Sequence, residues 1–221
     1  MDDTRAFTPA LGLPALTNSY DRVLAFMTRE HQWRSQLVSS IAPRAGEVIV
    51  DIGSGTGSLA IMLKTVTPDS RVIAMDPDPQ ARRLAEHKAR KSEADINFIT
   101  AMGADAADAV PHRSIDKVVV CLVLHQCRMA EKRAILSAAH AMLKPGGRLF
   151  IADYGLQPDP AMKVLFNLVR LLDGYSDTRA NKNGQIPILM GQAGFGSVQE
   201  AWRIRTPTGA ISHWTAQRTS A

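Results

Sequence analysis

Apolar and polar positions follow two different periods along this chain. Between Asn18 and Ser40 apolar residues recur at helical spacing and Pro43 closes the segment, which predicts one or two helices. The period then shortens, because 47–52 is a short apolar run typical of a buried strand and ends in a cluster of glycines. A helical apolar stripe resumes at Leu59, so the pattern predicts a strand, a tight turn and a helix.

The same alternation recurs four more times. The predicted strand and helix pairs are 71–76 with 78–91, 96–100 with the weakly helical 103–110, 116–124 with 130–143, and 148–153 with 160–172. Strands that alternate with helices pair in parallel, because each helix returns the chain across the sheet. After Gly194 two strand-like runs, 198–205 and 210–218, flank a short turn, which predicts an antiparallel pair. We therefore expect an α/β fold with a doubly wound, seven-stranded, mostly parallel sheet and an antiparallel C-terminal pair.

Composition narrows the class of protein. The chain has 221 residues, of which 45% are hydrophobic and 21% charged, so it can bury a core as one domain without metal or disulfide. Cys121 and Cys127 match neither a zinc half-site nor a disulfide framework, which favours a reducing, cytoplasmic setting and no metal. The net charge of +5 is diffuse, which argues against a nucleic-acid partner. No export signal or membrane-spanning run is recognisable, and no pattern indicates an oligomeric state.

The most informative motif follows the first predicted strand and reads Asp51-Ile-Gly-Ser-Gly-Thr-Gly57. Glycines at such a turn let a ligand approach the backbone, whose N–H groups favour polar or anionic atoms. Ser58 stands where the dinucleotide pattern has a small Gly or Ala, and no P-loop ending in Gly-Lys-Ser/Thr is present. Asp76 ends the second strand, where a carboxylate can bind a ribose diol. The motif predicts a nucleoside site; the alternatives are a ligand-free turn and, for Asp76, a helix N-cap.

These residues, with the strand Asp116–His125 and the Lys-Pro-Gly-Gly turn within Leu143–Asp153, resemble the class I S-adenosylmethionine-dependent methyltransferases. Ser19–Arg22 and Trp33-Arg34 are similar to the entry helices of the ubiquinone/menaquinone-biosynthesis group. The resemblance implies a three-layer Rossmann-like fold. It also implies transfer of a methyl group from S-adenosylmethionine to a small-molecule acceptor by in-line displacement, on O, N or C, leaving S-adenosylhomocysteine. The alternatives are an RNA or protein methyltransferase, a non-catalytic S-adenosylmethionine-binding protein and a nicotinamide-dependent reductase.

The resemblance also implies roles for individual residues in cofactor binding. Asp51 would hold the methionine ammonium group and Asp76 the ribose, while Pro77 would pack near the adenine. An acidic residue and a small one after the third strand would read the adenine edge, but the register at 102–106 is ambiguous. The expected cofactor-binding residues are Tyr20, Asp51, Gly53, Ser54, Gly55, Gly57, Asp76, Pro77, Ala104, Asp105, Cys121 and Leu122.

His125 directly follows the fourth predicted strand, where α/β folds place groups that face a ligand. An ordinary histidine pKa of about 6.5 suits a catalytic base, but His125 can equally be a group that only lines the acceptor pocket.

We also expect a division into an N-terminal helical lid (1–42) and a cofactor-binding domain (43–221), in which 155–194 covers the acceptor site. Loops at this end of such a sheet usually build the acceptor pocket, although an exposed connection without substrate contact is an equal alternative. The candidates to bind the acceptor are Tyr154, Tyr175, Arg179 and Asn181.

Overall fold

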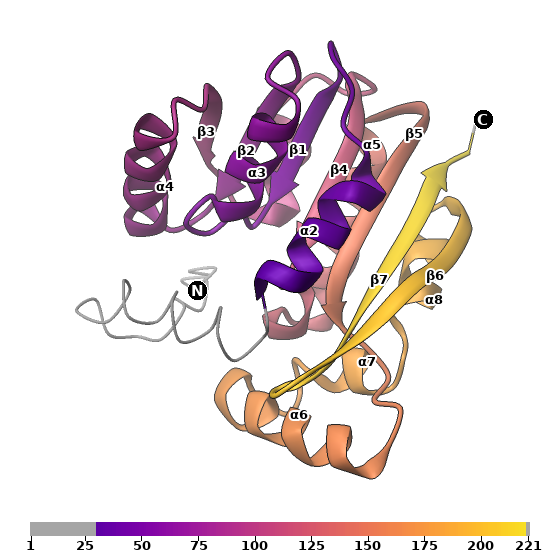
Figure 1. Ribbon diagram of the computed structural model, residues 1–221. Coiled ribbons are helices and arrows are strands. Elements are labelled where there is room, and N and C mark those ends of the chain that lie inside the picture. Colours follow the sequence, from indigo (N-terminus) through magenta and orange to yellow (C-terminus); the bar gives the residue numbers. More distant parts are fainter. Residues whose placement is uncertain (1–29, 220–221) are drawn as a thin grey trace, which may run out of the picture.

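Seven strands form one sheet within residues 30–219, the part of the chain that the structure, a computed structural model, describes (Figure 1). The sheet order is β3-β2-β1-β4-β5-β7-β6. β1 to β5 pair in parallel, and β7 lies antiparallel to both β5 and β6. This confirms the predicted doubly wound sheet with its antiparallel C-terminal pair. The strands are β1 (Val48–Ile52), β2 (Arg71–Asp76), β3 (Ile96–Thr100), β4 (Ile115–Cys121), β5 (Leu143–Tyr154), β6 (Phe195–Thr206) and β7 (Gly209–Arg218).

Helices cover both faces of the sheet, because successive side chains of a strand point to opposite sides. Val50 and Ile52 of β1 pack in one apolar cluster with α5, whereas Ile49 packs in a second cluster with α2 and α3. The helices are α2 (Glu30–Ile41), α3 (Ser58–Val66), α4 (Pro79–Lys91), α5 (Met129–Met142), α6 (Pro160–Asp173), α7 (Arg179–Lys182) and α8 (Ile186–Gln192), with the 3₁₀ turns η2 (Gly103–Ala109) and η3 (Leu124–Gln126). The weakly helical stretch 103–110 is therefore a 3₁₀ helix.

Two helices begin for reasons that are visible in the sequence. Asp78 accepts a hydrogen bond from the N–H of Gln80 at the start of α4, and Asp159 accepts one from Met162 at the start of α6. Each cap is followed by a proline, which lacks the N–H that a first helical turn leaves unpaired. The capping residue of α4 is thus Asp78, which leaves Asp76 at the strand end for another role.

Of the predicted lid, residues 1–29 with Tyr20 lie outside the described part of the chain. α2 is described from Glu30, and its Trp33, Leu37 and Ile41 are completely buried in the second apolar cluster, which α2 shares with α3 and Ile49. The division into a lid and a domain stays a prediction.

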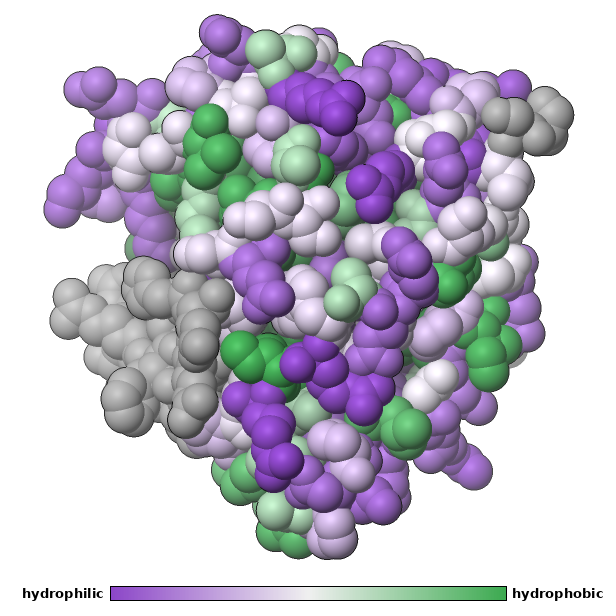
Figure 2. Space-filling view, turned by 45° about the vertical axis from the view of Figure 1, so that its right-hand side comes forward, coloured by the Kyte–Doolittle hydropathy of each residue, from purple (hydrophilic) through white to green (hydrophobic). Residues whose placement is uncertain are grey.

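The segment 155–194 folds as α6, α7 and α8, and α6 and α7 lie beyond the carboxyl ends of β4 and β5 (Figure 1). Within residues 30–219 no helix is long and apolar enough to cross a bilayer. In the view of Figure 2, hydrophobic residues form separate small groups among hydrophilic ones.

Candidate active site

The sheet order reverses between β1 and β4. β1 leads to its neighbour β2 on one side, whereas the chain returns after β3 to place β4 on the other side. Ligands of open α/β sheets bind at such a switch point, beside the carboxyl ends of the strands. The glycine loop after β1 and the turn after β4 meet here, because a Cβ built on Gly53 would lie 2.3 Å from Cγ2 of Val123. The candidate site is therefore at this junction.

The glycine loop is held in one shape but leaves open space beside it. Gly53 and Ser54 both donate their N–H groups to the carbonyl of Met75, at 2.8 and 2.9 Å. Gly55 has φ +53°, in the left-handed region that favours glycine, and a Cβ there would meet no atom of the described residues within 4 Å. The space that a side chain would fill is thus available to a ligand.

Asp76 connects the end of β2 to this loop. Its Oδ2 accepts the N–H of Gly55 at 2.8 Å, and its Oδ1 accepts the N–H of Asp78 at 2.9 Å. Burial raises the pKa of the Asp76 carboxyl, although both hydrogen bonds act in the opposite direction. Because each carboxylate oxygen has two lone pairs, both can still accept a hydroxyl group. The position fits the expected ribose contact.

Asp51 lies on β1 and is 1% exposed. Within residues 30–219 neither of its carboxylate oxygens has a hydrogen-bond partner. Burial raises the pKa of this carboxyl to about 7; Arg34 on α2 lowers it and Asp76 raises it further. A buried carboxylate without a partner is costly, and a cationic ligand group would offset that cost. A buried carboxylate without a hydrogen-bond partner, followed along the chain by a glycine loop with free space beside Gly55, therefore fits the amino-acid part of S-adenosylmethionine.

The remaining described residues of the expected cofactor set lie along the same carboxyl edge. Gly57 closes the loop by donating its N–H to Ser54, and Pro77 follows Asp76. Ala104 and Asp105 are on η2, after β3. Cys121 ends β4, and Leu122 has φ +55°, which is uncommon for a residue with a side chain and typical of constrained functional sites. Their contact with a cofactor stays a prediction.

His125 is held by a carboxylate that the sequence alone did not indicate. Its Nδ1 lies 2.8 Å from Oδ1 of Asp153, and its backbone N–H donates to Oδ2 of the same residue at 3.2 Å. Asp153 is completely buried near the end of β5. The sequence signal that could have indicated Asp153 was an aspartate near the end of the apolar strand β5, which pairs with β4. The other ring nitrogen, Nε2, lies 3.5 Å from Oδ2 of Asp173, the last residue of α6.

The groups around His125 shift its pKa in opposite directions. Burial lowers its pKa, but the charge and hydrogen bond of Asp153 and the charge of Asp173 together raise it more, while Lys132 lowers it. The net pKa of His125 is above its usual value. An imidazole oriented at Nδ1 by a buried carboxylate presents Nε2 as the nitrogen that exchanges protons.

Two of the four acceptor candidates lie beside His125. The ring of Tyr154 meets the imidazole edge-on at 5.0 Å between centroids, and its hydroxyl hydrogen-bonds to Oγ1 of Thr208. Asn181 is buried and donates Nδ2 to the carbonyl of Tyr154 at 2.8 Å. Tyr175 and Arg179 are exposed, and the Tyr175 ring lies 4.5 Å from the guanidinium of Arg170. Binding of the acceptor by any of the four stays a prediction.

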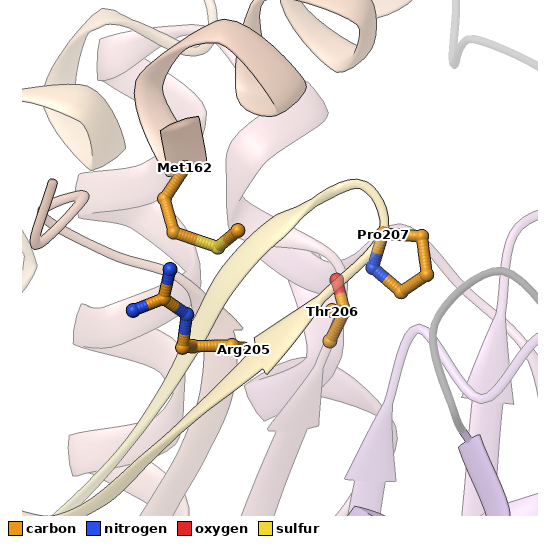
Figure 3. Close-up of a pocket in the computed structure, with 4 residues that line it drawn as sticks. All are labelled: Met162, Arg205, Thr206 and Pro207. Atoms are coloured by element: carbon orange, nitrogen blue, oxygen red, sulfur yellow. The ribbon is translucent and has the colours of Figure 1, made fainter. Parts of the chain in front are cut away.

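A pocket of about 320 Å³ lies away from His125, between the start of α6 and the turn that joins β6 to β7 (Figure 3). It is lined by Met162, Arg205, Thr206 and Pro207. Met162 and Asp173 stand at opposite ends of α6, about 16 Å apart at the helical rise. This pocket is therefore separate from the His125 site.

Cys121 and Cys127 are not in a disulfide within residues 30–219, and burial raises the pKa of the Cys127 thiol to about 12. In the described part of the chain no three or more His, Cys, Asp or Glu side chains are grouped to hold a metal ion.

The fold is that of the Rossmann-like methyltransferases. Residues 50–149 match the family described as "Methyltransferase domain". The solved structure of the YcgJ protein from Bacillus subtilis aligns with a TM-score of 0.69 and 13% identity, over 86% of this chain and all of that one.

Two curated relatives match by sequence. A demethylmenaquinone methyltransferase of Thermus thermophilus is 28% identical over 67% of this chain and 65% of its own length. A ribosomal protein L11 methyltransferase of Burkholderia mallei is 29% identical over 62% of this chain and 43% of its own length. The chain thus spans less than two thirds of either relative. The matched family and both relatives are methyltransferases, which confirms the resemblance seen in the motifs and disfavours a nicotinamide-dependent reductase.

Proposed function

We propose that this protein transfers a methyl group from S-adenosylmethionine to a small-molecule acceptor. The observation that carries this is the pair His125–Asp153, which lies at the strand end next to the glycine loop. The pair would place a base beside the expected nucleoside cradle, formed by Asp51, the glycine loop and Asp76. A protein that only bound the cofactor would not require a buried, carboxylate-oriented imidazole at this position.

The residues of the cradle would hold the cofactor in three parts. Asp51 would receive the ammonium group, the backbone around Gly55 would lie along the methionine part, and Asp76 would accept the ribose hydroxyls. S-adenosylmethionine, when bound, supplies a methyl group activated by the sulfonium sulfur. The main contribution of the protein would be to hold the acceptor at attack distance and to exclude water.

His125 would act as the base for an acceptor that carries a proton. The Nδ1–H group donates to Asp153, which leaves the Nε2 lone pair to take the proton from an acceptor hydroxyl or amine. The deprotonated acceptor atom would then receive the methyl group that bound S-adenosylmethionine supplies, with S-adenosylhomocysteine as the second product. Removal of such a base usually costs about 10²–10⁴ in rate.

A small acceptor is the preferred substrate class. A demethylmenaquinone methyltransferase that matches over 67% of this chain acts, by its name, on a quinone-type molecule. Because a ribosomal protein L11 methyltransferase also matches this chain, a protein acceptor is the alternative. The atom that is methylated and the cytoplasmic location stay predictions.

Methyl-labelled S-adenosylmethionine, incubated with the protein and a cell extract, tests this proposal. We expect label in the small-molecule fraction; label only in protein or RNA would favour the alternatives, and binding without transfer would refute an enzyme. His125→Ala should lower turnover about 10²-fold or more, with unchanged affinity for S-adenosylhomocysteine by calorimetry. His87→Ala, on the exposed side of α4, is the matched control.

A further inference from the structure

Asp173 brings a second carboxylate to His125 from a different part of the fold. It is the last residue of α6, and its Oδ2 lies 3.5 Å from Nε2 of His125. Its side chain is 26% exposed, whereas Asp153 on the other side of the ring is completely buried. The imidazole therefore stands between a buried carboxylate and one that reaches solvent.

The other groups that face His125 come from β5 and α5. The Tyr154 ring packs against the imidazole, and Lys132 of α5 is the nearby cation that lowers the pKa of His125. The ammonium group of Lys132 is held by the carbonyls of Cys127 and Asp177, so it is fixed in place. Within the described residues, Asp173 is the carboxylate that faces the nitrogen assigned to proton transfer.

The short distance between Nε2 of His125 and Oδ2 of Asp173 limits where an acceptor can lie. An acceptor atom on the line between Nε2 and Oδ2 would lie only about 1.8 Å from each, because the two are 3.5 Å apart, which is far shorter than a hydrogen bond of about 2.8 Å. An acceptor must therefore approach Nε2 beside Asp173. The carboxylate then stays in contact with the imidazole during the reaction.

We propose that Asp173 is a positioning residue that holds the imidazolium form of His125 and passes its proton to water. The inference rests on the proposed function, in which the acceptor proton moves to Nε2. That proton would then leave Nε2 for the Asp173 carboxylate, and from this partly exposed group it would pass to solvent, which restores the neutral base. Asp153 orients the ring and is the stronger attraction for its charged form, whereas Asp173 adds a second carboxylate on the side from which the proton leaves.

Replacement of Asp173 by Asn keeps the shape of the side chain but removes the charge. An opposite charge close to a histidine favours its protonated form. In Asp173→Asn the midpoint of His125 titration should fall, so the base is neutral at lower pH and the acid limb of kcat/KM against pH moves to lower pH. At alkaline pH turnover should decrease, because the charged product form is held less well.

The first measurement is an NMR titration of the His125 ring in the full chain without cofactor, with His125→Ala used to assign the resonance. We expect a lower midpoint in Asp173→Asn, an unchanged one in Asp177→Asn, and recovery in Asp173→Glu. Asp177 is a fair control, because it lies on the same segment and its carboxylate accepts a hydrogen bond from Ser176. An unchanged midpoint in Asp173→Asn would overturn the inference.

The second measurement is the pH profile of methyl transfer. A profile of Asp173→Asn that is superimposable on the wild type, despite a shifted titration, would overturn the role in proton release. A protein that transfers no methyl group to any fraction would instead refute the proposed function. The titration needs no acceptor, so the two failures are distinguishable.

Discussion

Replacement of Gly55 by Ala separates the binding role of the glycine loop from its folding role. Gly55 has φ +53°, where alanine costs about 1–2 kcal/mol, partly offset by about 0.4–1 kcal/mol from a less flexible unfolded chain. A Cβ at this position meets no atom of residues 30–219 within 4 Å, so these residues add no packing cost. The net loss of about 1 kcal/mol corresponds to a Tm lower by about 2–4 °C in a chain of this size.

The effect on the cofactor should be larger. The new methyl group would occupy the open space beside the loop, where the ligand must approach the backbone. We expect the affinity for S-adenosylhomocysteine to fall at least about tenfold, or about 1.4 kcal/mol, in a calorimetric titration.

Gly46→Ala is the matched control for this effect. Gly46 has φ +78°, also has nothing within 4 Å of a Cβ, and lies before β1 at the opposite edge of the sheet. It should lose a similar amount of stability and no affinity. If Gly55→Ala bound within about twofold of the wild type, or if Gly46→Ala lost as much affinity, the assignment of the loop would be wrong.

Three further substitutions test other parts of the site. Gly53→Ala should destabilise the fold by about 2–5 kcal/mol in urea denaturation, because left-handed strain adds to the 2.3 Å clash with Val123; a loss equal to that of Gly46→Ala would contradict this. The Asp51 carboxyl has its pKa raised from 3.8 to about 7, so the folded state holds a proton that the unfolded state releases, and stability falls as pH rises between these values. Asp51→Asn should remove this loss, worth up to about 4 kcal/mol. The cofactor-free variant should thus gain stability over the wild type at pH 8 but not near pH 4, and equal stability at both would refute the prediction. Asp153→Asn should lower turnover about 10²-fold or more through loss of imidazole orientation, while affinity for S-adenosylhomocysteine is retained; normal turnover would exclude the pair as the base.

The order of strands and helices was predictable because it depends on local patterns. Short, mostly apolar runs mark the parallel strands, with a glycine cluster after the first and an aspartate at the end of the second and fifth. Capping by Asp78 and Asp159 marks two helix starts. Boundaries were less accurate: β5 begins at Leu143 and β6 at Phe195, because strand pairing extends into residues whose own propensity favours turns. The glycine loop and Asp76 were also readable, since positive φ and a strand-end carboxylate are properties of a few adjacent residues.

The surroundings of His125 were decided by the tertiary structure. The parallel register pairs Cys121 with Ala152, which brings the turn after β4 beside Asp153, 28 residues further along the chain. The packing of α6 then adds Asp173, and no local pattern distinguishes that residue from any helix-terminal Asp. Likewise, only the fold places Asn181 against Tyr154 and leaves Tyr175 in solvent. The sequence by itself therefore determined the glycine loop and the carboxylate at the end of β2, because each depends on a few adjacent residues, whereas the carboxylates around His125 come from segments that only the tertiary structure brings together.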